Sequence, residues 1–477
     1  MLSEKSLKPI LSHLKNDIKK DIERNNINRA IKSLSVLCDL KMDFYTEYYD
    51  QDVEDFIGIL SNQIFPSLSN YSTKESHVVM IDSMAWDYHG LTQQYLRSFM
   101  SMDLNILYVM IKSPCKSDQI LRELEEYGKA QVYIFDMARQ NIVEQLVDLY
   151  HTVVSFSAAH IFLHSFSIID PILLSALPVP AKYRINFGDH HCWSGVSCTN
   201  YMIEFHNWGA TLSYQIKGVS KERIIVQPYY PIEDNVPFCG LPEVDEHKVI
   251  IFSGGASYKI KDKEMTFLKL VLRLLDENPR AVIFYASRDD DQLFKEFIVK
   301  NQLQERFFLI GYRSDLKAVF ERIDIYLNTY PMGGALMAQY AKKNGRPELC
   351  LIDYKRNIDD LCTEAKKLIQ DEQHRKNVGA VLKKEILTEN DFNHSISKII
   401  SEKKTDYKFT EISRDFESYR RNLQQQSFNK DSSAKIAGFL YSLYSFKYLL
   451  RFPYMIVFHG TIFKILEKAW GKLYKYK

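Results

Sequence analysis

The sequence is poor in glycine and cysteine, and these shortages limit the classes of protein to which it can belong. Only 18 of its 477 residues are glycine, so any glycine pair is informative. The 7 cysteines are scattered, and no two of them form a Cys-x-x-Cys pair. This argues against both a disulfide framework and a thiolate zinc site. Free cysteines are typical of a reducing compartment, so we expect a cytoplasmic protein.

Long apolar runs and a strong net charge are also missing. No stretch of about 20 apolar residues is present, so we expect no membrane-spanning helix. Residues 1–21 are lysine-rich and amphipathic, and we expect no secretory signal there. The formal net charge is only +2, and no basic cluster with interleaved aromatic residues marks the body of the chain. We therefore expect no nucleic-acid partner.

Short apolar segments alternate with amphipathic ones over most of the chain. The alternation predicts repeated βα units, and hence mostly parallel sheets covered by helices on both faces. A proline-containing stretch between residues 228 and 242 indicates a linker between two such series. Within the first series, Val153–Phe156 is predicted to be a strand. We therefore predict an α/β fold of two facing Rossmann-like domains with extra helices at both ends, bounded as residues 1–75 (N-terminal helical segment), 76–235 (first domain), 245–395 (second domain) and 396–477 (C-terminal helical segment).

Two glycine pairs follow predicted strands in the second domain. Gly254 and Gly255 come directly after an apolar segment. Gly333 and Gly334 follow a predicted strand that ends at Asn328. Glycine lets a backbone approach phosphate groups closely, and a following helix offers unpaired N–H groups with a partial positive charge. Because ligands of open α/β sheets bind at the carboxyl ends of the strands, the two loops predict a pyrophosphate pocket.

Three segments together resemble nucleotide-sugar glycosyltransferases of the B-type fold. Phe252–Ile260 (FSGGASYKI) is similar to the first donor-domain loop of the O-linked N-acetylglucosamine transferases and their bacterial relatives. Asn328–Pro347 is similar to their second donor loop. Ile185–Gly195 (INFGDHHCWSG) resembles the Asp-His-x-x-Trp-x-Gly segment of bacterial surface-polysaccharide transferases. The resemblance spans residues 77–355 and implies that the first domain binds an acceptor and the second a sugar nucleotide.

The resemblance gives Lys259 the most specific role. It implies that this lysine binds the nucleotide diphosphate, where a fixed ammonium neutralises the charge that grows as the sugar–phosphate bond breaks. The alternative is a solvated lysine beside Lys261 and Lys263 at a helix start. The resemblance also implies no metal and no cofactor, because the nucleoside diphosphate sugar is a co-substrate. The predicted donor-binding residues are Gly254, Gly255, Lys259, Asn328, Gly333, Gly334 and Gln339.

The second donor loop departs from the family pattern in two ways. The paired glutamates of many retaining enzymes are absent, and so are the Thr-Thr pair and the aspartate that holds the ribose in the O-linked enzymes. Ala335–Tyr340 stands there instead, and Gln339 is the candidate to hold the ribose. The donor sugar and the base of the nucleotide therefore stay open. The stereochemistry stays open as well, with inversion favoured.

A polar loop after the first predicted strand carries the candidates for acceptor activation. The strand ends at Ile81, and the loop from Asp82 to Gly90 includes Asp87 and His89. Imidazole titrates near neutrality, so His89 is the predicted base that deprotonates an acceptor hydroxyl. Asp82 and Asp87 are predicted to orient this base or to act as the base themselves. The alternative is a capping or surface histidine in a polar loop.

A second polar loop of the first domain contains adjacent histidines. Such a pair on a short loop cannot easily converge on one tetrahedral ion, so we favour an acceptor-side role over a metal site. The acidic run Asp289–Asp291 begins a predicted helix, where acids favour the helix dipole, and we interpret it as structural. The predicted acceptor-side residues are Asp189, His190, His191 and Trp193, with Glu204 and His206 as further candidates.

The C-terminal region mixes aromatic residues with lysines. We expect Ser432–Leu449 to pack against the protein. For the remainder, packing and contact with a membrane surface are both open. A lipid-linked acceptor would account for membrane contact.

These patterns favour one function over two alternatives. The favoured function is transfer of a sugar from a nucleoside diphosphate sugar to a hydroxyl of a glycan, lipid-linked or protein acceptor. The expected setting is cytoplasmic synthesis of a bacterial surface glycan such as a capsule polysaccharide, peripheral to the inner face of the membrane. The alternatives are a catalytically inactive partner or chaperone of an active glycosyltransferase, and a sugar-nucleotide epimerase.

Overall fold

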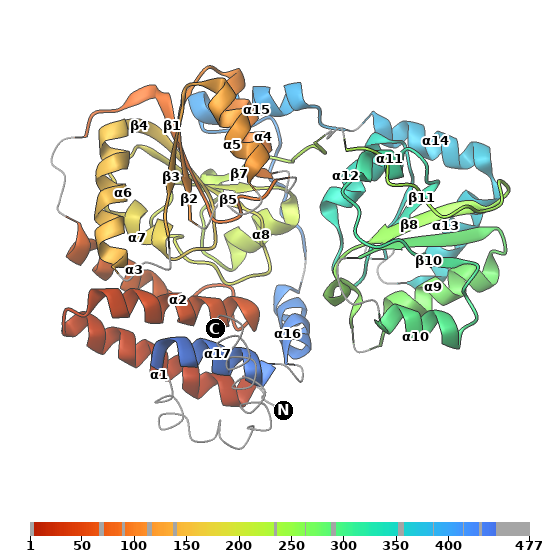
Figure 1. The fold of residues 1–477 in the computed structure, drawn as a ribbon, viewed down its shortest axis with the longest axis horizontal. Coiled ribbons are helices and arrows are strands. Elements are labelled where there is room, and N and C mark those ends of the chain that lie inside the picture. Colours follow the sequence, from red (N-terminus) through yellow and green to blue (C-terminus); the bar gives the residue numbers. More distant parts are fainter. Residues whose placement is uncertain are drawn as a thin grey trace, which may run out of the picture. The chain divides into compact units, whose positions relative to one another are not determined.

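A computed structural model divides the chain into two compact units (Figure 1). The first unit comprises Met1–Pro228 and Asn393–Lys477, and the second comprises Tyr229–Phe392. Each unit is built around its own sheet. The described residues are 4–65, 71–87, 91–111, 117–136, 141–232, 236–262, 264–287, 292–351, 357–384, 386–413, 415–428 and 432–444.

The first unit contains a sheet whose seven described strands pair in parallel, in the order β3-β2-β1-β4-β5-β6-β7. The interior strand β4 is buried along its whole length, as expected of a parallel strand covered on both faces. Parallel pairing brings the carboxyl ends of the strands to one edge, where ligands of such sheets bind. The strands are β1 (Lys74–Asp82), β2 (Asn105–Met110), β3 (Ala130–Ile134), β4 (Ala158–His164), β5 (Ala181–Asn186), β6 (Tyr201–Glu204) and β7 (Ile224–Val226).

Helices from distant parts of the chain cover this sheet. On one face, residues of β1, β2 and β4 share a hydrophobic core with α6, α7, the N-terminal helices and α17. Figure 1 shows α1, α2 and α17 side by side beneath the sheet. On the other face, Tyr95 and Phe99 of α4 pack on Phe162 of β4. The helices of this unit are α1 (Glu4–Glu23), α2 (Ile27–Asp43), α3 (Gln51–Ile64), α4 (Leu91–Ser101), α5 (Asp118–Tyr127), α6 (Ile142–Phe156), α7 (Ile169–Ala176), α8 (Asn207–Gln215), η1 (Lys221–Arg223), α16 (Phe416–Ser427) and α17 (Ser432–Tyr444), while α15 (Glu389–Glu402) spans the boundary between the two units in the chain.

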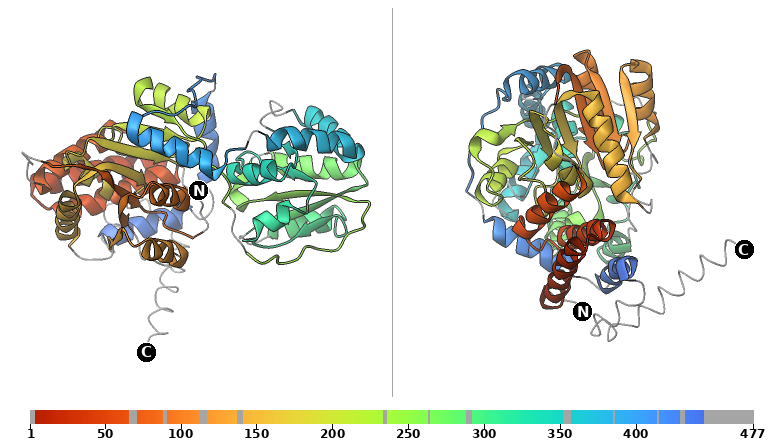
Figure 2. Two further views of the ribbon diagram at one scale, coloured as in Figure 1. Left: turned by 90° about the horizontal axis from the view of Figure 1, so that it is seen from above. Right: turned by 90° about the vertical axis from the view of Figure 1, so that its left-hand side faces the viewer.

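The second unit contains a parallel sheet with the strand order β10-β9-β8-β11-β12 among its described residues. Side chains alternate between its faces, so Ile283 and Tyr285 of β9 enter one core and Val282 and Phe284 the other. Figures 1 and 2 show helices on both faces of this sheet. Its elements are β8 (Val249–Gly254), η2 (Ser257–Ile260), α9 (Thr266–Glu277), β9 (Ala281–Ala286), α10 (Gln292–Lys300), β10 (Phe307–Leu309), α11 (Leu316–Phe320), β11 (Ile325–Leu327), α12 (Ala335–Lys343), β12 (Glu348–Leu349), α13 (Ile358–Gln370) and α14 (Glu372–Lys383).

The predicted fold class, α/β with two parallel sheets, is confirmed. The predicted strand Val153–Phe156 is wrong, because these residues form the end of α6 and the strand follows at Ala158–His164. A short apolar run has the same pattern in a buried helix as in a buried strand, which explains the error. None of the described helices is both long and apolar enough to cross a membrane. Residues 445–477 lie outside the described residues, and they include the whole segment after Leu449 for which membrane contact was left open.

Candidate functional site

The two predicted donor loops of the second unit lie next to each other. They follow β8 and β11, which are neighbours in the sheet. The N–H of Met332 donates a hydrogen bond of 3.2 Å to the carbonyl oxygen of Lys259. Thr329 also approaches the first loop, since its Cγ2 lies 3.7 Å from where a Cβ on Gly255 would stand. The sequence prediction that both loops form one site is therefore consistent with the geometry of this unit.

The glycine pair of the first loop allows close packing. A Cβ on Gly254 would stand 2.9 Å from the carbonyl oxygen of Ala286, a distance that real side chains do not tolerate. Gly255 has a φ of +155°, and a Cβ there would stand 3.2 Å from Cδ of Lys259. The N–H of Gly255 already donates to the carbonyl of Ala286, at 2.9 Å. These glycines therefore contribute space for the backbone and for the Lys259 stem, while the Gly255 amide is already in use.

Lys259 occupies η2, directly after this glycine pair, and its side chain is half-buried. Burial lowers the pKa of its ammonium group below the ordinary value for lysine. Among the described residues, its ammonium group makes no ion pair and no hydrogen bond. A cation that is partly removed from water without compensation costs free energy, and a bound anion would recover it. The alternative of a fully solvated lysine does not fit this position.

Asn328 organises the second loop. Its Oδ1 accepts hydrogen bonds from the N–H of Gly334 at 2.7 Å, the N–H of Thr329 at 2.9 Å and the hydroxyl of Tyr326 at 3.1 Å. Its Nδ2 donates to Oε1 of Glu348 at 2.7 Å. The side chain is only 6% exposed. Asn328 therefore shapes the loop from within, and neither its Oδ1 nor the Gly334 amide is open to a phosphate.

Helix α12 begins where this loop ends. The first N–H groups of a helix have no acceptor within the helix, and Gly334, at the N-cap, makes no side-chain hydrogen bond to them. The amides of residues 335–337 and the positive end of the helix dipole therefore face the loop. Gly333 is exposed and has no side chain, so it does not cover this end of the helix. Gln339 lies one turn into the helix and is half-buried, on the same face as Ala335.

In the first unit, Asp82 lies at the carboxyl end of β1 and is completely buried. Its oxygens accept hydrogen bonds from the Thr92 hydroxyl at 2.6 Å and the Tyr108 hydroxyl at 2.9 Å, and contact Nδ1 of His164 at 3.1 Å. Burial alone would raise the pKa of Asp82, but His164 and these hydrogen bonds hold it below its ordinary value. An ionised, enclosed carboxylate of this kind fixes the ends of neighbouring strands and does not reach an acceptor.

Asp87 caps a helix. Its two carboxylate oxygens accept hydrogen bonds from the N–H groups of Gln119 and Ile120, each at 3.0 Å, in the first turn of α5. Both oxygens are therefore engaged in helix capping, one of the commonest structural roles of an aspartate. The predicted base His89 lies outside the described residues, which stop at 87 and resume at 91. Helix capping by Asp87 was not anticipated, because the capping alternative was stated for His89.

Asp189 lies in the loop after β5, and its Oδ2 is 3.2 Å from Nε2 of His206. Glu204, at the end of the neighbouring strand β6, is completely buried. Both of its oxygens accept hydrogen bonds from Nδ2 of Asn186, at 3.1 and 2.9 Å, and Oε1 also accepts one from the Ser213 hydroxyl at 2.5 Å. Two acids thus meet at the carboxyl ends of two adjacent strands.

The neighbouring histidines face the N-terminal helices. The ring of Tyr45, after α2, lies 5.9 Å from His190 and 5.2 Å from His191 between ring centroids. Burial lowers the pKa of His191 to about 4, so its ring is neutral at physiological pH. Among the described residues, no group of three or more His, Cys, Asp or Glu side chains is placed to hold a metal ion. The acidic run Asp289–Asp291 lies outside the described residues.

Trp193 is enclosed and carries two cations over its ring. Cζ of Arg184 lies 4.3 Å from the ring centroid, and Nζ of Lys217 lies 3.9 Å from it. Trp193 is only 4% exposed, so it stabilises the loop rather than presenting its face to solvent. The sequence reasoning missed both cations. Arg184 had a signal, since a charged residue inside an apolar strand requires buried partners, whereas Lys217 at the end of a helix had none.

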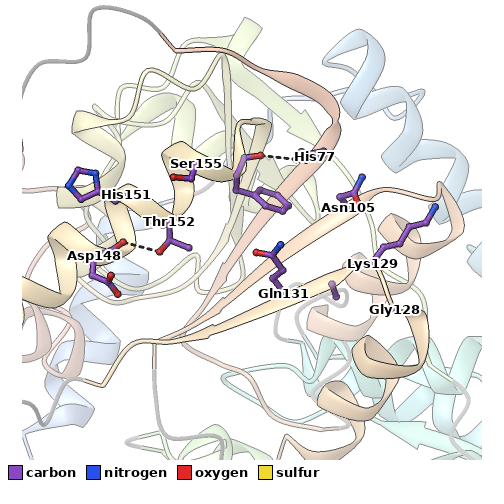
Figure 3. A pocket seen from close by; sticks show the side chains of 11 residues that line it. His77, Asn105, Gly128, Lys129, Gln131, Asp148, His151, Thr152 and Ser155 are labelled. Carbon is purple, nitrogen blue, oxygen red and sulfur yellow. Dashed lines mark hydrogen bonds between the residues drawn. The ribbon is translucent and has the colours of Figure 1, made fainter.

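A hollow of about 690 Å³ opens at the opposite, amino edge of the first sheet (Figure 3). It lies between the starts of β1, β2 and β3 and the last turns of α6, and none of the predicted site residues lines it. Nδ1 of His77 is bonded to the carbonyl oxygen of Phe156 at 2.7 Å. The ammonium of Lys129 is paired with Asp103 at 2.6 Å. Because its lining residues His77 and Lys129 are both engaged, we assign no ligand to this hollow.

The known proteins that this chain resembles are similar to it in structure. The chain matches no family model and no curated protein. A glycosyltransferase from Rickettsia africae has a TM-score of 0.53 and 10% sequence identity, over 70% of this chain and 99% of that one. The lipopolysaccharide outer core galactosyltransferase WaaB has a TM-score of 0.51 and 11% identity, over 69% and 99%. HepE from Anabaena, in complex with UDP and glucose, has a TM-score of 0.50 and 12% identity, over 68% and 99%.

Identities this low carry the fold and nothing finer. Two parallel sheets in separate units, each flanked by helices, agree with these structures over more than two thirds of the chain. The protein therefore has the B-type glycosyltransferase fold.

Proposed function

We propose that the protein transfers a sugar from a nucleoside diphosphate sugar to a hydroxyl group of an acceptor. The observation that carries this proposal is the state of Lys259. Its ammonium group is partly buried, has a lowered pKa and has no partner among the described residues. It follows the end of a parallel strand, where sheets of this kind bind ligands. A diphosphate supplies the missing negative charge through a charge-assisted hydrogen bond.

The start of α12 supplies the second part of the donor site. Its first-turn amides and its dipole favour a phosphate group, and the two loops are tied by the Met332–Lys259 hydrogen bond. Asn328 holds the loop that presents these amides, so it acts as a positioning residue. The glycines Gly254, Gly255, Gly333 and Gly334 contribute room for the ligand. Gln339, on the same helix, binds the ribose in this proposal.

The reaction is a single displacement at C1 of the sugar, with inversion. The acceptor oxygen forms a bond to C1 while the bond from C1 to the diphosphate oxygen breaks, and its electron pair leaves on the diphosphate. Lys259 and the amides of α12 neutralise the charge that grows there. Removing one such donor typically lowers kcat about 10²- to 10³-fold. The acceptor hydroxyl loses its proton to a base of the first unit.

Among the three candidates in the loop after β1, His89 remains for the role of base, because the other two are engaged. Asp82 is enclosed by Thr92, Tyr108 and His164, and Asp87 caps α5. Asp189, His190, His191 and Trp193 are proposed to serve the acceptor side, Trp193 by stabilising the loop that carries the others and Asp189 through its carboxylate, which lies 3.2 Å from His206.

The substrate class and setting are finer proposals. WaaB is named as a galactosyltransferase of the lipopolysaccharide outer core, and HepE is described in complex with UDP and glucose. These names support a uridine diphosphate sugar as donor. They also support a glycan or lipid-linked acceptor in bacterial surface-glycan synthesis, with a protein acceptor as the alternative. We propose that the reaction takes place in the cytoplasm, at the inner face of the membrane.

Release of nucleoside diphosphate from sugar nucleotides tests the proposal. The full chain is incubated with UDP-glucose, UDP-galactose, UDP-N-acetylglucosamine and GDP-mannose, with water as the acceptor. We expect the wild type to release the diphosphate from one of them, Lys259→Met to do so about 10²- to 10³-fold more slowly, and the exposed Lys261→Met to match the wild type. Binding without turnover would instead identify an inactive partner, and interconversion of sugar nucleotides without release would identify an epimerase.

A further inference from the structure

Four ionisable side chains gather at the carboxyl ends of β5 and β6. Asp189 follows β5, Glu204 ends β6, His206 stands at the N-cap of α8, and Lys217 follows that helix. The cluster lies in the first unit, so the donor loops do not account for it. Perturbed, desolvated titratable groups at a sheet edge are characteristic of functional sites.

The two carboxylates meet beside the first turn of α8. A Cβ on Gly209 would stand 2.5 Å from Oε2 of Glu204 and 2.7 Å from Oδ1 of Asp189. A side chain at this point of the helix would force the two carboxylates to move. The positive end of the α8 dipole faces both acids and favours their charged forms. The first turn of α8 and the two carboxylates are therefore packed against each other at one place.

Lys217 is a second, independent sign of function at this place. It is only 3% exposed, and its Nζ has no hydrogen-bond partner among the described residues. Burial lowers the pKa of Lys217 to about 7, although Glu204 and Asp189 act in the opposite direction. Its Nζ lies 3.9 Å from the centroid of the Trp193 ring, but the N–H groups make no hydrogen bond among the described residues, and leaving them without an acceptor costs free energy.

The two acids differ in exposure and in charge. Glu204 is enclosed, and burial together with the nearby Asp189 raises its pKa to about 8, so it carries its proton at neutral pH. The Asp189 side chain is 14% exposed. Burial raises the pKa of Asp189 as well, while His206 and Lys217 oppose that rise. Of the two acids, Asp189 is the one that reaches solvent, so it is the carboxylate that an acceptor hydroxyl can approach.

His206 holds Asp189 in place. Its Nδ1 accepts a hydrogen bond from the N–H of Gly209 at 3.2 Å, which leaves the ring proton on Nε2. That Nε2 lies 3.2 Å from Oδ2 of Asp189, so the protonated nitrogen faces the carboxylate. With both nitrogens engaged, His206 has no site for a substrate proton, and its task is to orient the carboxylate.

We propose that Asp189 is the general base that takes the proton from the acceptor hydroxyl, with His206 as its positioning residue. This proposal rests on the proposed function. As the acceptor oxygen forms its bond to C1 and the C1–diphosphate bond breaks, the hydroxyl proton passes to a carboxylate oxygen of Asp189. After the product leaves, Asp189 returns that proton to water. The assignment replaces His89 as the base.

The test uses the full chain and diphosphate release from the sugar nucleotide that the wild type turns over, with water as acceptor. We expect Asp189→Asn to lower the rate about 10²- to 10⁴-fold and to leave the Kd for UDP within about twofold of the wild type. Asp189→Ala, which leaves room for a small acid, regains rate on addition of formate. The control Asp103→Asn changes an exposed aspartate that pairs only with Lys129 among the described residues, and it retains the wild-type rate.

The positioning role of His206 has its own readout. His206 lowers the pKa of Asp189, so in His206→Gln the acidic limb of the rate–pH profile moves to higher pH. Glu204, Lys217 and Tyr48 also act electrostatically around Asp189 and are unchanged in this variant. A merely structural histidine would change the melting temperature without moving this limb.

The possible results distinguish a wrong assignment of the base from a wrong proposed function. An active wild type whose Asp189→Asn variant is equally active overturns the assignment, and loss of rate in His89→Ala alone returns the base to His89. A slow Asp189→Ala that formate does not rescue, with a lowered melting temperature, makes Asp189 structural. A wild type that turns over none of the four sugar nucleotides overturns the proposed function and this inference with it.

Discussion

Two requirements on Lys259 oppose each other. Its side chain has to be partly buried to keep a fixed position, and its ammonium group has to stay charged to bind a phosphate. Burial lowers its pKa, and no ion pair among the described residues compensates. The sequence pattern singled out this residue because a lysine after a glycine pair has few structural uses. The pattern could not indicate how far its ammonium is removed from water, which depends on packing against Gly255 and the second loop.

The lowered pKa of Lys259 predicts how UDP affinity depends on pH. A bound diphosphate favours the charged ammonium, so the pKa of Lys259 is higher in the complex than in the free protein. Affinity is therefore greatest below the lowered free-state pKa and falls as pH rises through it, with proton uptake on binding. Isothermal titration calorimetry above pH 7, in buffers of different ionisation enthalpy, measures both effects. Lys259→Arg should bind UDP with no such fall, because guanidinium stays charged.

Asp82 and Asp87 show what residue patterns leave undetermined. An acid after a strand indicates a site, but the same residue also caps helices and ties strands together. Asp87 meets the amides of α5, more than 30 residues away in the chain, and Asp82 meets Thr92, Tyr108 and His164. Such long-range partners are decided by the fold, so the role of either acid could not be predicted from its neighbours in sequence.

The capping role of Asp87 predicts a stability effect. Asp87→Ala removes the acceptors of two first-turn amides, and we expect it to lower the free energy of unfolding by about 1 kcal/mol. Asp87→Asn keeps an acceptor at the same place and should cost much less. Urea denaturation followed by circular dichroism compares the two. Equal losses for both variants would show that the cap does not depend on this oxygen.

At the scale of elements, the strand ends could be predicted better than the helices. The glycine loops after β8 and β11 were anticipated because apolar strands followed by glycine pairs have few other interpretations. The end of α6 was mistaken for a strand because valine and phenylalanine suit both when buried. The start of α8 held no visible signal at all, although Gly209 there decides how closely two acids approach.

Gly209 therefore predicts an effect opposite in sign to helix propensity. Alanine normally stabilises a helix relative to glycine, by up to about 1 kcal/mol. At Gly209 the new Cβ would collide with Glu204 and Asp189, so we expect Gly209→Ala to lower the free energy of unfolding by about 1–3 kcal/mol. The matched control is Gly58→Ala in α3, where no atom lies within 4 Å and stability should rise. Chemical denaturation of both variants measures the contrast, and stabilisation by both would contradict the carboxylate contact.

At the scale of the whole molecule, the sequence predicted two βα series but not how the chain ends join them. The helices predicted as separate N-terminal and C-terminal segments share one hydrophobic core with the first sheet. Tyr444 of α17 also donates a hydrogen bond of 2.8 Å to Asp17 of α1. Amphipathic helices show which face is apolar, but the partner of that face can lie anywhere in the chain. The described part of Ser432–Leu449 packs against the protein as expected, but its partner helices could not be predicted from its sequence.

Isothermal titration calorimetry tests whether Lys259 and α12 bind a diphosphate. The full chain is titrated with UDP and UMP, and with GDP and GMP in parallel. We expect the wild type to bind one diphosphate at least about tenfold more tightly than its monophosphate, a difference of about 1.4 kcal/mol. In Lys259→Met the diphosphate should bind about 10- to 100-fold more weakly and the monophosphate nearly as before. If the wild type binds neither diphosphate, or if Lys259→Met binds diphosphate as tightly as the wild type, the proposed donor site is wrong.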